Sequence, residues 1–413
     1  MNKTIEPATT TTTTQVPIRI LIVGAGAVGC FYGSRMHHPP DALVSLVCRS
    51  NYSAIKRSGV QLQTRNFGDY TFNPEFVFSS IQEASEARIP LTEVTHTNNN
   101  NNTNETSPGP ISSSSSSPTL FHDSSSSPAP TFTSSLQNSP DVSAVITWDY
   151  VVVTTKALPD VSDDSSLITR VIHPFKTAIV LIQNGVGVED PYQTRFPDNS
   201  VLSAVTVVSA EQVQPGVIVQ NRWTRISIGP YGALQDGEAR TKEIVKLLKR
   251  GGVKDAEVYT EKALQQVRWH KIAINGSMNP SAVLSSTENA RMVKSPELRR
   301  HLKGCMEEVF HAAHVVLGEP LPSYLPTAEQ ILTSSERNTG GRPSMLVDWE
   351  KGHPMELEVI LGNPIRIARS KGVEMPRLQA MYSLLVTAQA RRDEKREKKL
   401  IRQDNITLQR SRL

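Results

Sequence analysis

Three polar side chains recur every four residues inside an otherwise apolar stretch of the chain. Lys271, Asn275 and Asn279 stand in the segment RWHKIAINGSMNPSAVL, residues 268–284. On a helix, residues four apart share one face, so the three side chains would form a row. Their apolar neighbours are typical of a buried helix, in which a polar group needs a partner. The row predicts hydrogen-bond donors that face a ligand; the alternative is a polar stripe that faces solvent. A lysine in such a row would present a positively charged hydrogen-bond donor to the ligand. Pro280 is expected to end or kink the helix at Asn279.

A strand and a glycine-rich turn near the N-terminus predict a second ligand site. The apolar run IRILIV, residues 18–23, predicts a buried parallel strand. In a G-x-G-x-x-G motif that follows a strand, the first glycine permits the tight turn, the second lets the backbone approach a pyrophosphate, and the third lets the next helix pack. The N–H groups at that helix start bind phosphate. We expect a dinucleotide site rather than a bare turn at Gly24, Ala25, Gly26, Ala27, Val28 and Gly29.

The end of the second predicted strand bears on the choice of cofactor. Residues 42–48, ALVSLVC, lead into Arg49 and Ser50. NAD enzymes usually place an aspartate or glutamate there to bind the ribose hydroxyls, and none is present. A guanidinium can grip a 2′-phosphate in a forked contact, which favours NADPH over NADH. The alternative is that Arg49 is a solvated loop residue.

Two further predicted strands, residues 150–154 and 178–182, end in polar residues. The first leads to Lys156 and the second to Asn184. Because strand carboxyl ends face the ligand crevice of an open α/β sheet, Lys156 is expected near cofactor or substrate, or else is an exposed loop lysine. Asn184 belongs to an Asn-Gly turn and is also a candidate for binding the nicotinamide ribose or the substrate.

The rest of the chain is expected to complete the sheet and then form helices. Residues 201–208 continue the sheet, and residues 216–220 and 225–229 predict an antiparallel pair. A helix at 238–250 ends this part. Further helices are expected at 296–317, from about residue 344, and through residue 356.

Composition excludes several classes of protein. The chain has 413 residues, enough for about two domains, and its net charge of +4 does not suggest a nucleic-acid partner. Cys30, Cys48 and Cys305 form no metal-ligand or disulfide pattern. No apolar stretch is long enough to span a membrane, and no secretory signal is apparent. We expect a cytoplasmic protein without metal, nucleic-acid or membrane partners, and leave a mitochondrial location open.

Composition also divides the chain into segments. Residues 1–16 predict a disordered tail, and a Ser/Asn/Thr-rich run at about 93–145 predicts a disordered insertion. Around this insertion we place a cofactor-binding domain at residues 17–256 and a helical domain at 257–392. Residues 393–413 form a charged tail, expected to be a fraying helix end.

Taken together, these motifs resemble the 2-dehydropantoate 2-reductase family, also called the ketopantoate reductases. The resemblance rests on GAGAVG, TTKA at Lys156, QNGVG at Asn184, WHKIAINGSMNPSAVL at Lys271, and SMLVDWEKGHPMELEVILGNPI. It implies an α/β plus all-α fold: an N-terminal Rossmann-type dinucleotide-binding domain, a C-terminal all-helical domain and an active site in the cleft between them. It also implies NADPH-dependent reduction of ketopantoate to pantoate, on the route to pantothenate and coenzyme A.

The resemblance further implies roles for individual residues. Lys271 resembles the family's catalytic lysine and Glu356 its active-site glutamate. Arg49 and Lys156 resemble cofactor-binding residues, as does Asn184. The expected substrate-binding residues are Asn184, Asn275, Asn279 and Ser344. The long polar insertion departs from compact family members, and so does the longer loop between residues 294 and 344.

Other functions stay open at this point. A related 2-keto acid or 3-hydroxy acid reductase would use the same lysine and carboxylate on a different substrate chain. A nicotinamide-binding regulatory protein would bind cofactor without turnover, because a fold alone does not fix function. The sequence does not decide the oligomeric state, and a homodimer is compatible with it.

Overall fold

The computed structural model describes residues 16–90 and 143–410, with side chains described as far as residue 398. The expected N-terminal tail lies almost wholly outside the described residues, as does most of the expected insertion. The described end of that insertion, Ser143–Val145, is strand β7, which pairs antiparallel with β6 (Arg88–Pro90). This hairpin belongs to one compact unit, while Pro17–Glu86 and the chain from Thr147 onward form another.

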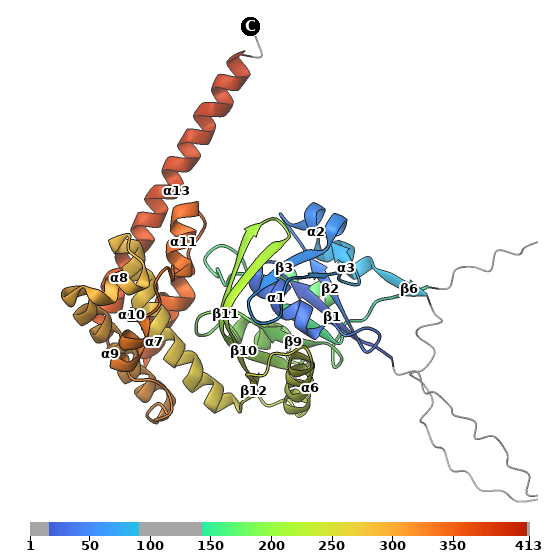
Figure 1. Cartoon of the computed structure of the whole chain (residues 1–413), viewed down its shortest axis with the longest axis horizontal. Coiled ribbons are helices and arrows are strands. Elements are labelled where there is room, and N and C mark those ends of the chain that lie inside the picture. The colour runs from blue at the N-terminus through green and yellow to red at the C-terminus, as the bar shows by residue number, and fades with distance from the viewer. Residues whose placement is uncertain (1–15, 91–142, 411–413) are drawn as a thin grey trace, which may run out of the picture. The chain divides into compact units, whose positions relative to one another are not determined.

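The larger unit contains a ten-stranded sheet in the order β4-β3-β11-β10-β9-β8-β1-β2-β5, with β12 beside β11. Figure 1 labels β1, β2, β3, β9, β10, β11 and β12 of this sheet. Its strands are β1 (Ile18–Val23), β2 (Ala42–Val47), β3 (Val60–Thr64), β4 (Tyr70–Phe72), β5 (Val77–Phe78), β8 (Tyr150–Val153), β9 (Ala178–Leu181), β10 (Val201–Gln214), β11 (Val217–Tyr231) and β12 (Ala256–Val258).

The centre of the sheet is parallel and brings four strand ends together. Strands β9, β8, β1 and β2 are parallel neighbours. Strands β8 and β9 are buried throughout and consist almost wholly of Val, Ile, Leu and Ala, as parallel strands covered on both faces require. Parallel strands end at one edge, so the glycine turn, Arg49, Lys156 and Asn184 all lie at the carboxyl edge of this sheet.

One predicted pairing in this sheet is wrong. Residues 216–220 and 225–229 were expected to pair with each other, but residues 217–220 and 225–229 belong to the single long strand β11, which pairs antiparallel with β10. Gly216, with φ of 77°, sits at the hairpin turn between β10 and β11. Such a turn favours glycine, and it reverses the chain at the start of the first segment rather than between the two segments.

Short helices and one long helix accompany the sheet. They are α1 (Ala27–Met36), α2 (Tyr52–Ser58), α3 (Ile81–Glu86), α4 (Asp164–Leu167), the 3₁₀ turn η2 (Thr169–Val171), α5 (Asp190–Arg195) and α6 (Gly237–Arg250). Helix α6 has Ile244, Leu247 and Leu248 buried on one face, in the apolar core that also contains β1, β2 and α1.

The chain after β12 is helical. Its elements are α7 (Glu261–Ser285), α8 (Asn289–Lys294), α9 (Pro296–Leu317), α10 (Ala328–Glu336), α11 (Ser344–Lys351), the π-helix η3 (Glu358–Gly362), α12 (Asn363–Ser370) and α13 (Pro376–Arg410). The expected order, an α/β part followed by an all-helical part, is confirmed.

Three details of the helical part differ from expectation. Helix α7 does not end at Asn279 but continues past Pro280 to Ser285, because Ala282 and Val283 beyond the proline are buried in the core. Glu356 lies in the irregular segment just before a helical turn and not within a helix. Helix α13 runs unbroken to Arg410, past the boundary expected after residue 392.

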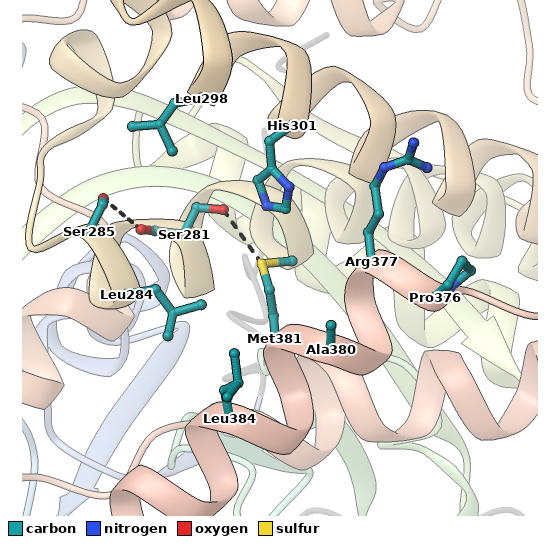
Figure 2. Close-up of a pocket in the computed structure, with 10 residues that line it drawn as sticks. All are labelled: Ser281, Leu284, Ser285, Leu298, His301, Pro376, Arg377, Ala380, Met381 and Leu384. Atoms are coloured by element: carbon teal, nitrogen blue, oxygen red, sulfur yellow. Dashed lines mark hydrogen bonds between the residues drawn. The ribbon is translucent and has the colours of Figure 1, made fainter.

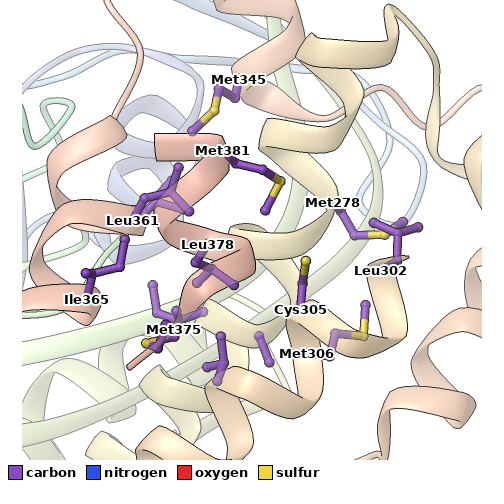
Figure 3. Packing of buried hydrophobic residues seen from close by; sticks show 14 of the residues in the cluster. Met278, Leu302, Cys305, Met306, Met345, Leu361, Ile365, Met375, Leu378 and Met381 are labelled. Atoms are coloured by element: carbon purple, nitrogen blue, oxygen red, sulfur yellow. The ribbon is translucent and has the colours of Figure 1, made fainter. Parts of the chain in front are cut away.

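The helical part has an apolar core of its own. Figure 3 shows methionine, leucine and isoleucine side chains from several helices packed together, with Cys305 among them. The labelled members are Met278, Leu302, Cys305, Met306, Met345, Leu361, Ile365, Met375, Leu378 and Met381. Helix α7 contributes Met278 and contacts α9, α11 and α13. It is therefore held by neighbours along its length, which gives its polar residues fixed positions.

Candidate active site

Lys271, Asn184 and Glu356 form one continuous chain of hydrogen bonds. Lys271 Nζ donates to Asn184 Oδ1 at 2.9 Å, and Asn184 Nδ2 donates to Glu356 Oε2 at 3.1 Å. Lys271 and Asn184 are half-buried, whereas Glu356 is only 6% exposed. These residues come from α7, the turn after β9 and the segment before η3. Asn184 therefore joins the expected catalytic lysine to the expected active-site glutamate, and Glu356 acts on Lys271 through it.

Burial and charge change the proton affinities of both ionisable groups. The pKa of Lys271 is lowered from 10.5 to about 8, first by burial and then by the Arg268 cation, while the Glu356 carboxylate raises it. Burial raises the pKa of Glu356, whereas the hydrogen bond from Asn184 and the charge of Lys156 lower it. Lys271 thus stays an ammonium at neutral pH but gives up its proton more readily than an exposed lysine.

The turn that carries Asn184 is docked tightly on the π-helix η3. Gly185 has φ of 101°, and a Cβ atom there would lie 2.3 Å from the Cβ atom of Val359. The Val186 N–H donates to the Val359 carbonyl at 3.0 Å. Only glycine fits such a close approach at positive φ. The Asn-Gly sequence is therefore a turn, as expected, and also a contact that fixes Asn184.

Lys156 is connected to the same site through a partner that sequence reasoning missed. It forms an ion pair with Asp348 of α11, and the next residue's N–H, that of Ala157, donates to Glu356 Oε1 at 3.4 Å. The Lys156 side chain is 42% exposed and that of Asp348 is 10% exposed. A signal for Asp348 existed, since it stands four residues after Ser344 in the same predicted helix.

The other expected substrate residues have free polar groups. Asn275 is half-buried and Asn279 is 6% exposed, on the same sector of α7 as Lys271. Within the described part of the chain, neither amide side chain has a hydrogen-bond partner. Ser344 is exposed at the first residue of α11, and no side-chain bond links it to Lys271 among the described residues. The two asparagines are thus available to a ligand.

The glycine turn has the shape that a dinucleotide requires. A Cβ atom on Gly29 would lie 2.3 Å from the Gly24 carbonyl oxygen, and one on Gly24, at φ of 109°, would lie 2.8 Å from the Thr155 nitrogen. At Gly26 a Cβ atom would meet nothing within 4 Å. Gly24 and Gly29 are therefore needed for the turn itself, whereas Gly26 leaves its space open. Helix α1 begins there without a side-chain cap, so its first N–H groups are free for a phosphate.

Arg49 follows β2 at the same sheet edge and is exposed. Within the described residues its side chain makes no ion pair or hydrogen bond. Two residues later, the buried Asn51 donates to the Ala25 carbonyl at 2.6 Å and so ties this segment to the glycine turn. Sequence reasoning missed Asn51, and a short polar residue directly before a helix was the available signal.

A buried arginine was also missed. Arg268 lies one helical turn before Lys271 and forms an ion pair with Glu189, with side chains 2% and 1% exposed. Polar residues flank both in the sequence, among them Asp190 beside Glu189 and Gln266 and His270 near Arg268, so no local pattern marked a buried pair.

A separate groove of about 750 Å³ lies among α7, α9 and α13 (Figure 2). Ser281 Oγ donates to Met381 Sδ at 3.5 Å within it. Its lining residues are Ser281, Leu284, Ser285, Leu298, His301, Pro376, Arg377, Ala380, Met381 and Leu384. None of them was expected at the site, and the hydrogen-bond chain around Lys271 lies elsewhere.

Among the side chains that the structure describes, no group of three or more His, Cys, Asp or Glu residues could hold a metal ion. No helix within residues 16–90 and 143–410 is long and apolar enough to cross a membrane. Cys30, Cys48 and Cys305 are free and buried.

Family models match most of the chain. The model described as ketopantoate reductase PanE/ApbA matches residues 20–100 and 117–233, and the model of the ketopantoate reductase PanE/ApbA C terminal matches residues 263–389. An uncharacterised protein of Saccharomyces cerevisiae is 27% identical over 401 residues, which cover 92% of this chain and 95% of that protein.

Solved structures give the same picture. The crystal structure of 2-dehydropantoate 2-reductase from Methylococcus capsulatus is similar with a TM-score of 0.67 at 26% identity, covering 91% of this chain and 98% of that one. D-mandelate dehydrogenase with NADH and anilino(oxo)acetate has a TM-score of 0.63 at 17% identity, covering 91% and 99% of the two chains. The second likeness concerns the fold alone.

Proposed function

The chain belongs to the ketopantoate reductase (PanE/ApbA) family, and we propose that it reduces 2-dehydropantoate to pantoate with NADPH. The family indicates an NAD(P)-dependent oxidoreductase that acts on a CH–OH group. The observation that carries the proposal is the Lys271–Asn184–Glu356 chain at the sheet edge where the glycine turn also lies. A proton donor and a cofactor site at one edge are the two parts that carbonyl reduction needs.

The residues present fit a dinucleotide. The pyrophosphate would lie over Gly26, where space is open, against the free N–H groups that begin α1. Arg49, exposed and without a partner among the described residues, would bind the 2′-phosphate and favour NADPH. When bound, the nicotinamide supplies the hydride that adds to the ketone carbon.

Lys271 would complete the reduction. Its ammonium would donate a hydrogen bond to the ketone oxygen, stabilise the negative charge as it forms and then transfer the proton, leaving a hydroxyl. The pKa of about 8 makes this transfer easier than from an ordinary lysine. Asn184 holds the ammonium at 2.9 Å and so fixes its direction.

The remaining polar groups would orient the substrate. Asn275 and Asn279 would donate to the carboxylate, because their amides are free on the Lys271 side of α7. Glu356 would accept a hydrogen bond from the substrate's other hydroxyl. Ser344 and Lys156 are proposed at the edge of the same site. Holding the substrate in a reactive orientation can lower the reaction barrier by roughly several kcal/mol.

The test is ketopantoate-dependent oxidation of NADPH by the purified protein, with NADH in parallel. We expect turnover with a preference for NADPH that Arg49→Ala reduces. Lys271→Ala should lower kcat by roughly 10²–10⁴-fold, the range for loss of a general acid, while NADPH still binds by fluorescence titration. Near-normal turnover by Lys271→Ala with NADPH bound would overturn the assignment.

A related 2-keto acid is the second candidate. The lysine and asparagines would act on any 2-keto acid, and exposure of Ser344 leaves the substrate's tail less constrained. A panel of keto acids in the same assay decides between them: the acid with the highest kcat/KM is the substrate. Tight NADPH binding without turnover on any of them would instead favour a regulatory protein. If ketopantoate is preferred, the product would serve pantothenate and coenzyme A synthesis.

A further inference from the structure

The buried pair of Arg268 and Glu189 connects α7 to the sheet. Arg268 Nε lies 3.0 Å from Glu189 Oε1, and both side chains are almost fully enclosed. Glu189 Oε1 also accepts from Ser203 Oγ at 2.6 Å and from Gln265 Nε2 at 3.2 Å. Glu189 thus interacts with two residues of α7, Gln265 and Arg268, and with one residue of β10.

The guanidinium also binds the backbone on both sides of Asn184. Arg268 Nη1 donates to the Gln183 carbonyl at 3.1 Å and to the Gly185 carbonyl at 2.8 Å. Its Nη2 donates to Ser203 Oγ at 2.5 Å and to the Ala204 carbonyl at 3.1 Å. The flat, forked guanidinium is suited to several directed bonds at once. One side chain therefore links the helix of Lys271, the turn of Asn184 and strand β10.

We propose that Arg268, held by Glu189, is a positioning residue that sets the orientation of Lys271 towards Asn184 and the substrate. This inference rests on the proposed function, because Arg268 would act only through Lys271. It stands three residues before Lys271 on α7, so its contacts fix the helical turn that presents the ammonium. A mere anchor would not need to bind the carbonyls on either side of Asn184.

Charge supports the geometry. The Arg268 cation is among the causes that lower the pKa of Lys271. Buried ion pairs cost desolvation that well-packed apolar side chains of similar volume would avoid, so stability alone does not call for this one. Substitutions can separate the effect of geometry from that of charge. Arg268→Lys keeps the charge and loses the forked set of guanidinium donors, whereas Arg268→Gln loses both.

The test measures Lys271 directly, without turnover. Reductive methylation at a series of pH values, with the Lys271 peptide quantified by mass spectrometry, gives the midpoint at which the amine becomes neutral. We expect Arg268→Gln to move that midpoint up and Glu189→Gln to move it down, because they remove opposite charges. Arg268→Lys should leave it nearly in place but lower kcat by about tenfold to a hundredfold, as misplacement of a catalytic group does.

Matched controls separate this effect from general damage. Arg299→Gln removes an arginine of α9 that pairs with Glu329 and Glu336 and should change neither the midpoint nor kcat. Should Arg268→Gln fail to fold, Arg268→Lys and Glu189→Gln still test the idea. A folded, NADPH-binding Arg268→Lys enzyme with the parent kcat and KM, or unmoved midpoints in both Gln variants, would overturn it. If the parent protein reduces no keto acid but the midpoints move as expected, the proposed function fails and the effect of Arg268 and Glu189 on Lys271 remains.

Discussion

At the scale of residues, the site depends on one amide side chain that has two hydrogen-bonding partners. Asn184 accepts from Lys271 with its oxygen and donates to Glu356 with its nitrogen. An ammonium and a carboxylate can therefore share a partly buried site without forming a direct ion pair. A direct pair would hold the Lys271 proton more firmly, since a nearby carboxylate favours the charged form of lysine. The amide keeps the ammonium oriented and leaves its other N–H groups for a substrate.

The pKa of Lys271 gives a prediction for the pH dependence of activity. Because that pKa is lowered from 10.5 to about 8, the ammonium is present below about pH 8 and lost above it. We expect kcat/KM for ketone reduction to be level towards neutral pH and to fall by about tenfold per pH unit above pH 8. Initial rates of NADPH oxidation across this range measure it. Lys271→Arg, which stays charged, should show no such decline, and a decline in the parent enzyme only above about pH 10 would contradict the assignment.

At the scale of elements, the catalytic groups are placed by the ends of strands and by one helix. The sequence predicted β1 and α9 with their observed bounds, because an apolar run and a helical period are local signals. It also predicted the row on α7. It did not predict Asp348, Asn51 or the Arg268–Glu189 pair as parts of the site, because each meets a partner far away in the chain. The irregular segment at Glu356 was missed for the same reason: its conformation is set by contacts with Ala157 and Asn184.

The glycine turn yields a prediction in which two glycines behave oppositely. Gly29→Ala should lower the free energy of unfolding by about 1–3 kcal/mol, because the new methyl meets the Gly24 carbonyl and the Thr154 hydroxyl. Gly26→Ala should fold normally but raise the KM for NADPH by at least about tenfold, because its methyl fills the space left for the pyrophosphate. Thermal melts and NADPH titrations of both variants measure this. Equal loss of stability in the two would count against a cofactor at Gly26.

At the scale of the whole chain, the long polar run of residues 91–142 connects the two paired strands β6 and β7. The last residue of β6, Pro90, is opposite the first residue of β7, Ser143. Residues 91–142 themselves lie outside the described part, and their expected disorder stays a prediction, as do the domain boundaries and the cellular compartment. The two-part organisation could be predicted because its motifs are local and occur in chain order.

Replacing residues 91–142 by the dipeptide Asn-Gly should leave catalysis unchanged. The strands on either side are already paired, and Asn-Gly favours a two-residue hairpin turn. Loop closure becomes less costly as the loop shortens, so the melting temperature should stay equal or rise. Steady-state kinetics and thermal melts of the shortened protein test this, with kcat expected within about twofold because the removed segment contains none of the proposed site residues. A large loss of kcat would mean that the removed segment contributes to the site.

The two ion pairs near the site differ in their exposure to water, which bears on how the site can move. Arg268 and Glu189 are buried, and Arg268 also binds the carbonyls beside Asn184, so we expect α7 and this backbone to move together. Lys156 and Asp348 meet at a partly solvated position, where water screens the attraction and separation costs little. Motions that admit a keto acid and release a hydroxy acid are therefore expected at α11, while α7, which carries Lys271, is expected to move little.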